Sequence, residues 1–154
     1  MKKAVKWIAA VVVLAGIVLQ FFFRADLTNP PVEPGSDLMA TNAPPAEIAD
    51  LLRRSCYDCH SYETTWPWYS HVTPIGSFVA GHVNDGRDAM NFSEWPHDDP
   101  SAARKRLAKI SHHLQDSSMP LPSYTLIHWG ARLSAEQRKQ LEDWAAKTAE
   151  KLQH

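Results

Sequence analysis

The sequence holds a single cysteine pair, in the run Cys56-Tyr57-Asp58-Cys59-His60, and a histidine follows the second cysteine directly. Cysteines at this spacing lie about one helical turn apart, so their thiols can form thioether bonds with the two vinyl groups of a haem. The histidine beside the second cysteine then faces the iron and supplies a nitrogen ligand. The motif therefore predicts one covalently attached c-type haem, with Cys56, Cys59 and His60 as its binding residues.

Three other uses of the two cysteines remain open. They could form a disulfide, which an oxidising compartment permits. They could act as a thioredoxin-like redox pair, although that motif is typical of a βαβ setting, for which the sequence gives no sign. They could also be half of a zinc site, although the sequence contains no second CxxC and no His-x-x-x-His partner. The adjacent histidine and an exported location favour haem.

A sixth iron ligand is predicted at Met119, which lies in the run Ser-Ser-Met-Pro-Leu-Pro. A proline-stiffened loop can present a thioether to the iron, and Met/His ligation raises the reduction potential. The main rival is His82, on an apolar helix face, and an open sixth position is the other alternative. Further histidine candidates are His112, His113 and His128, whereas Met39 and Met90 are poorer thioether candidates.

Aromatic residues gather after the motif, and they have the flat apolar area that encloses a porphyrin, although ordinary core packing explains them equally well. They are Trp66, Trp68, Tyr69, Trp95 and Trp129, and the arginines that could pair with propionates are Arg53, Arg54, Arg87 and Arg132. The sequence shows no acid–base pair or nucleophile–base arrangement for substrate chemistry at a side chain, which favours an electron carrier over an enzyme.

The elements that must position these residues are predicted to be helices, because alternating runs rich in Val, Ile and Thr are absent. One helix runs from about residue 46 into the cysteines, and a second begins after Thr73 and ends at Gly86. A third follows Asp99, and a fourth begins at Ser134 in capping-box relation with Gln137. The body is therefore predicted to be all-α, with loops at 61–72 and 117–133 that are long enough to need a large apolar cofactor to organise them.

The amino terminus is predicted to be a membrane anchor. Residues 7–23 are apolar except for Gly16 and Gln20, and such a helix reaches about 25 Å, at the short end of a bilayer span. Lys2, Lys3 and Lys6 precede it, so the positive-inside rule places residue 1 in the cytoplasm and everything after Arg24 outside, in the periplasm. A cleaved signal peptide is the alternative, although the sequence after the apolar run lacks a small-x-small pattern.

Charge and proline are distributed unevenly along the chain. The first 24 residues carry four basic residues and no acidic one, whereas the other 130 hold 12 basic and 17 acidic residues. An acidic body argues against nucleic acid as a partner. Five of the eleven prolines lie in residues 26–45, which predicts an extended tether. The predicted organisation is an anchor over 1–24, a proline-rich linker over 25–45 and a haem-binding domain over 46–152.

Several runs together resemble the bacterial haem-binding domain family of membrane-anchored c-type cytochromes. They are the Cys56–His60 motif, Trp66-Pro67-Trp68-Tyr69, His82-Val83-Asn84, Asn91 to Trp95, Met119 to Tyr124 and the segment from Leu133 to Trp144. The chain departs from the pattern after His128, where Trp129-Gly130 replaces an expected proline.

The resemblance implies a monohaem, cytochrome-c-like helical domain on the outer side of the cytoplasmic membrane, with the family's Met-Pro motif falling on Met119. The expected function is single-electron transfer between membrane or periplasmic redox partners. The alternative is a peroxidase-like haem enzyme, or a gas or redox sensor, whose sixth iron site is open or labile.

Overall fold

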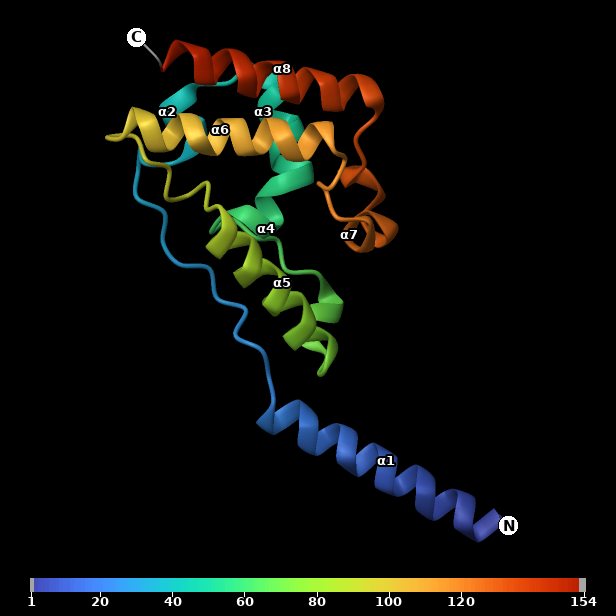
Figure 1. Cartoon of the computed structure of the whole chain (residues 1–154). Coiled ribbons are helices and arrows are strands. Elements are labelled where there is room, and N and C mark those ends of the chain that lie inside the picture. The colour runs from blue at the N-terminus through green and yellow to red at the C-terminus, as the bar shows by residue number, and fades with distance from the viewer. Residues whose placement is uncertain (1, 153–154) are drawn as a thin grey trace. The chain divides into compact units, whose positions relative to one another are not determined.

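The computed structural model describes residues 2–152, and within that range the chain is all-helical and contains no strand, as predicted. The longer helices are α1 (Lys2–Phe22), α5 (Ile75–Ala89), α6 (Pro100–Gln115) and α8 (Ala135–Lys151) (Figure 1). The shorter helices are α2 (Leu38–Asn42), α3 (Ala46–Leu52), α4 (Asp58–His60) and α7 (Pro122–Ile127). Between them lie a π-helical turn, η1 (Arg53–Tyr57), and two 3-10 turns, η2 (Trp68–His71) and η3 (Trp129–Ala131).

The chain divides into two compact units. The first unit consists of the residues up to Thr28 together with Thr65–Asp85, and it contains α1, η2 and most of α5. The second unit consists of Asn29–Thr64 together with the residues from Gly86 onward, and it contains the cysteine motif, α6, α7 and α8.

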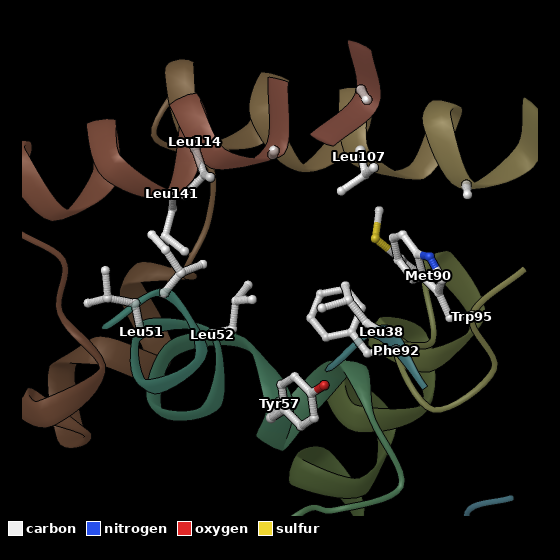
Figure 2. Close-up of a cluster of buried hydrophobic side chains, with 14 residues drawn as sticks. Leu38, Leu51, Leu52, Tyr57, Met90, Phe92, Trp95, Leu107, Leu114 and Leu141 are labelled. Atoms are coloured by element: carbon white, nitrogen blue, oxygen red, sulfur yellow. The ribbon is translucent and has the colours of Figure 1, made fainter. Parts of the chain in front are cut away.

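The core of the second unit lies where α6 and α8 pack against each other and α3 packs against α8. Figure 2 shows the labelled leucines of α3, α6 and α8 meeting there, with Tyr57, Phe92 and Trp95 beside them. Leu52, Leu107 and Leu141 are fully buried. Each such leucine contributes about 1.5–3 kcal/mol through the apolar surface that it removes from water. This core is the platform on which the cysteine motif is built.

Two of the long helices begin at a side-chain cap, and one of these caps is the predicted capping box. Ser134 and Gln137 form a complete capping box at the start of α8, each side chain accepting the backbone N–H of the other residue. The Asp99 carboxylate accepts the Ala102 N–H at the start of α6, at 2.9 Å. These caps satisfy N–H groups that have no partner inside their helices, so the local sequence fixes where both helices begin.

The tether prediction is wrong for part of residues 26–45. Leu38–Asn42 form α2, whose Asp37 carboxylate caps the Ala40 N–H at 3.0 Å. Leu38 is fully buried in the core of the second unit, and its N–H donates to the Phe92 carbonyl at 2.9 Å. The prolines of this segment favour extended backbone, which is why the sequence did not predict α2. The burial of Leu38, together with the Asp37 cap, outweighs that preference.

Helix α1 has the length and composition of a membrane span. Within the part of the chain that the structure describes, it is the one helix that meets both requirements, with a mean hydropathy of 2.2 and no buried residue. A single apolar helix near the amino terminus is compatible with single-pass anchoring in a membrane.

Candidate functional site

The two cysteines lie on consecutive helical turns, Cys56 in η1 and Cys59 in α4, and both are free thiols. Burial raises the pKa of Cys56 to about 12, and the neighbouring Cys59 adds to this; burial also raises the pKa of Cys59 to about 11. A thiol-exchange site needs the opposite shift, since the thiolate is the nucleophile. Among residues 2–152, no group of three or more His, Cys, Asp or Glu side chains is arranged to hold a metal ion.

His60 follows the second cysteine, and its ring is oriented by the backbone of the loop after α5. Its Nδ1 lies 3.0 Å from the Met90 carbonyl oxygen, and its ring stacks on Phe92 with the centroids 5.6 Å apart. Burial lowers the pKa of His60, which favours the neutral ring. In a neutral ring whose Nδ1–H donates to Met90, Nε2 carries the lone pair that binds a metal.

The backbone of the motif is also fixed in place. The Phe92 N–H donates to the His60 carbonyl at 2.6 Å, and the buried Ser61 hydroxyl donates to the Tyr57 carbonyl at 2.8 Å. Arg87 donates through Nε to the Ser61 carbonyl at 2.8 Å. Hydrogen bonds to three carbonyl groups, those of Tyr57, His60 and Ser61, therefore hold the backbone of the motif in place.

Gly86 permits this packing. It does not end the second predicted helix, because α5 continues to Ala89. A Cβ at Gly86 would overlap the carbonyl oxygen of Cys59 and would lie 3.2 Å from the Cys59 Cβ. The glycine is therefore required by the close approach of two backbones, and sequence reasoning mistook that requirement for a helix-stop signal.

Met119 is half-buried and lies in the loop between α6 and α7. Its N–H donates to the His113 carbonyl at 3.3 Å, and its own carbonyl accepts a hydrogen bond from the Arg138 guanidinium at 2.5 Å. The backbone of Met119 is thus tied to α6 and to α8, and neither bond involves its thioether.

A side-chain contact joins the Met119 segment to the cysteine motif. The Tyr124 hydroxyl, on α7, donates to the Asp58 carboxylate at 2.7 Å, and Asp58 lies between the two cysteines. A second tie is made by Arg54, whose guanidinium donates to the Gly130 carbonyl at 2.5 Å. Nothing in the sequence indicates these two ties, although Tyr124 lies in the same run as Met119.

The rival ligands have other surroundings. His82 belongs to the first unit and contacts Phe78, with the ring centroids 4.4 Å apart. His113 Nδ1 lies 2.8 Å from the Ser118 hydroxyl, and His128 stacks on Tyr124 at 4.3 Å. Met90 is buried in the core and contributes its carbonyl rather than its thioether to the site.

The aromatic and basic candidates divide between core and surface. Trp95 is buried in the core, whereas Trp129 is 72% exposed, with the Arg132 guanidinium 5.6 Å from its ring centroid. Leu126 and Ile127, also exposed, precede Trp129 and complete an apolar surface over α7 and η3. All four candidate arginines make protein contacts: Arg53 with Glu63, Arg54 with Gly130, Arg87 with Ser61 and Arg132 with Thr125.

The residues present fit a haem of the c type. Two free cysteines stand beside a histidine whose Nδ1 faces the Met90 carbonyl, and the segment that follows Met119 offers exposed apolar side chains suited to a porphyrin. Cys56, Cys59 and His60 are contiguous, and Met119 is connected to them through the Tyr124–Asp58 bond.

Comparison with known proteins agrees with this chemistry. A model of the haem-binding domain family matches residues 14–147. A curated relative, the cytochrome c peroxidase Ccp of Escherichia coli (strain K12), is 25% identical over 100 residues. That match covers 63% of this chain and 22% of the relative, so the chain spans less than a quarter of the relative's length. No solved structure matches the chain.

Proposed function

Because the chain belongs to the haem-binding domain family, we propose that it is a membrane-tethered monohaem c-type cytochrome that passes single electrons between redox partners. The observation that supports this most directly is the setting of His60. Its Nδ1 faces the Met90 carbonyl at 3.0 Å, which leaves Nε2 as the metal-binding nitrogen directly after a cysteine pair.

Cys56 and Cys59 would make the attachment covalent. Each thiol would add across one vinyl group, with sulfur forming the new C–S bond and its hydrogen passing to the neighbouring carbon, so no oxidant would be consumed. The burial that raises both pKa values keeps the thiols protonated until they react. When bound, the haem supplies a one-electron iron couple.

Met119 would close the sixth position and raise the potential of that couple. Its backbone bonds to His113 and Arg138, and the Tyr124–Asp58 bond, hold its loop on the second unit. The exposed side chains of Leu126, Ile127 and Trp129 would exclude water from the porphyrin edge. A closed, dry site suits electron transfer because nothing has to bind or leave the iron during turnover.

The proposed location follows from α1 and its flanking charges. Lys2, Lys3 and Lys6 would stay in the cytoplasm, so the haem domain would face the periplasm of a bacterial cell. Outside the first 24 residues the chain has 17 acidic and 12 basic residues, which favours redox partners with a basic docking face.

The test is the absorption spectrum of the full chain purified in detergent with its haem. The account predicts a low-spin spectrum with a near-red sulfur-to-iron band that is lost in Met119→Ala. His82→Ala is the matched control and should retain that band. A low-spin wild-type spectrum that lacks this band, is unchanged in Met119→Ala and becomes high-spin in His82→Ala would assign the sixth ligand to the histidine instead.

A second candidate function is a peroxidase-like enzyme or a sensor with an open iron site, and the similarity to the Escherichia coli relative is the observation that favours it. The full chain purified in detergent with its haem also distinguishes this function from electron transfer. A high-spin ferric spectrum and ready binding of carbon monoxide by the reduced, unmodified chain would contradict the carrier and support an open site.

A further inference from the structure

One stretch of the first unit is unlike the rest of the acidic chain. Residues 65–84 contain no Lys, Arg, Asp or Glu, although 17 acidic residues follow position 24. The nearest acidic residues are Glu63 and Asp85, which flank the stretch on either side. Within it, the only histidines are His71 and His82.

This stretch exposes large apolar side chains. The turn η2, the residue that follows it and the first turns of α5 carry four of them, with exposed fractions between 42% and 79%: Trp68, Val72, Ile75 and Phe78. We call these four residues the 68–78 surface. An uncharged surface with this much exposed apolar area marks a site of interaction with a membrane or a protein.

The 68–78 surface is hydrogen-bonded to the end of the apolar helix α1. The Gln20 side-chain amide donates to the His71 carbonyl at 2.7 Å, and its oxygen accepts the Thr73 N–H at 3.0 Å. The Thr73 hydroxyl also bonds to the Phe23 carbonyl, at 3.3 Å. Gln20 breaks the apolar run near its carboxyl end, and these bonds use both of its polar atoms.

These contacts fix the depth of the surface relative to α1. Residues that bond to the last turn of a membrane-spanning helix lie where that helix leaves the hydrocarbon, which is the headgroup region. Tryptophan is enriched at that depth because its ring is apolar and its N–H can bond to headgroups. The stretch itself adds no acidic side chain that would be repelled by anionic lipid, and Asp26, which lines a pocket with His71 and Thr73, shares that pocket with the basic Arg24.

We infer that the 68–78 surface lies in the outer headgroup region of the same bilayer that α1 spans, so that the first unit has a second, interfacial contact with lipid. The inference rests on the proposed spanning role of α1. It assigns Gln20 a structural task, because its amide joins the span to this surface.

Depth measurement by spin labelling tests the inference. Single cysteines replace Val12 in α1, Ile75 in the 68–78 surface and Asn84, an exposed α5 residue beyond it. Each full chain carries its haem, so that Cys56 and Cys59 are taken up as thioethers, and the chain without an added cysteine is the labelling blank. The nitroxide-labelled chains are placed in vesicles of phosphatidylethanolamine and phosphatidylglycerol.

The rate at which the nitroxide collides with oxygen, which concentrates in lipid, is measured and divided by its collision rate with a water-soluble nickel chelate. A higher oxygen-to-nickel ratio means a deeper position in the bilayer. The inference predicts an oxygen-to-nickel ratio at residue 75 that is several-fold above that at residue 84 and below that at residue 12. Equal ratios at residues 75 and 84, with residue 12 in lipid, would overturn the interfacial contact and leave the anchor intact. Shielding of residue 75 from both reagents would also overturn it, because protein or haem would then cover the surface. A water-exposed residue 12 would overturn both the anchor and the inference.

Discussion

His60 is held through its ring against a buried core, whereas Met119 is held through its backbone on a loop between two helices. The His60 ring faces the Met90 carbonyl and stacks on Phe92, and both of these residues are buried. The Met119 loop is tied down by hydrogen bonds from Arg138 and from Tyr124. Two proposed ligands of one iron therefore have supports of different strength.

The difference indicates that the histidine side and the methionine side have different roles, a distinction that we call the division of labour. The histidine side shares its contacts with the hydrophobic core, so loosening it costs core packing as well. The methionine side depends on a few hydrogen bonds, each worth about 1 kcal/mol, so it can be loosened while the core stays folded. The histidine side would then determine how firmly the haem is retained. The methionine side would determine the reduction potential of the iron and its accessibility to other ligands.

The largest expected effect comes from removing each ligand in turn. His60→Ala should abolish the low-spin spectrum and reduce the haem content of the purified chain, because no nitrogen ligand remains beside the cysteines. Met119→Ala should keep full haem content and change only the spectrum. Haem per chain and the absorption spectrum measure both effects, and His97→Ala, at an exposed histidine beside Asp98, is the control. Equal haem loss in the first two variants would contradict the division of labour.

A smaller effect is expected from the close contact behind the motif. Gly86→Ala places a Cβ against the Cys59 carbonyl, so we expect the free energy of unfolding to fall by about 1–3 kcal/mol through overpacking. Gly81→Ala, in the same helix with nothing within 4 Å of its added Cβ, should leave stability unchanged or raise it by up to about 1 kcal/mol. Thermal unfolding of the full chain followed by circular dichroism compares them. Similar midpoints for the two variants would argue against a rigid histidine side.

The smallest effect should come from the tie between the two sides. Tyr124→Phe removes the bond to Asp58, which is worth about 1 kcal/mol, so added imidazole should displace Met119 with an apparent affinity about fivefold tighter. Tyr62→Phe is the matched control, because Tyr62 bonds to the Glu94 carboxylate away from the Met119 loop. Spectral titration with imidazole measures the affinity. Wild-type affinity in Tyr124→Phe would show that this bond does not hold the loop.

Sequence reasoning succeeded where the signal is local. The starts of α6 and α8 follow from Asp99 and Ser134, because a cap bonds to a residue two or three positions away. The cysteine pair and His60 are likewise contiguous, so their spacing alone carries the prediction of haem chemistry. The family match over residues 14–147 confirms haem binding.

Sequence reasoning failed where partners are distant along the chain. The role of Gly86 depends on Cys59, and the tie made by Tyr124 depends on Asp58, which lies 66 residues earlier. The helix α2 depends on the burial of Leu38 beside Phe92. Such pairs form only after the chain has folded, so propensity and periodicity give no sign of them.

The central claim is that one haem is bound covalently through Cys56 and Cys59, and the most direct measurement is the intact mass of the unfolded chain together with haem staining on a denaturing gel. The account predicts a mass greater than that of the polypeptide by one haem, and a stained band that disappears in the Cys56→Ser/Cys59→Ser double variant. An unfolded wild-type chain with the bare polypeptide mass and no stain would contradict the account, because a covalently attached haem survives unfolding.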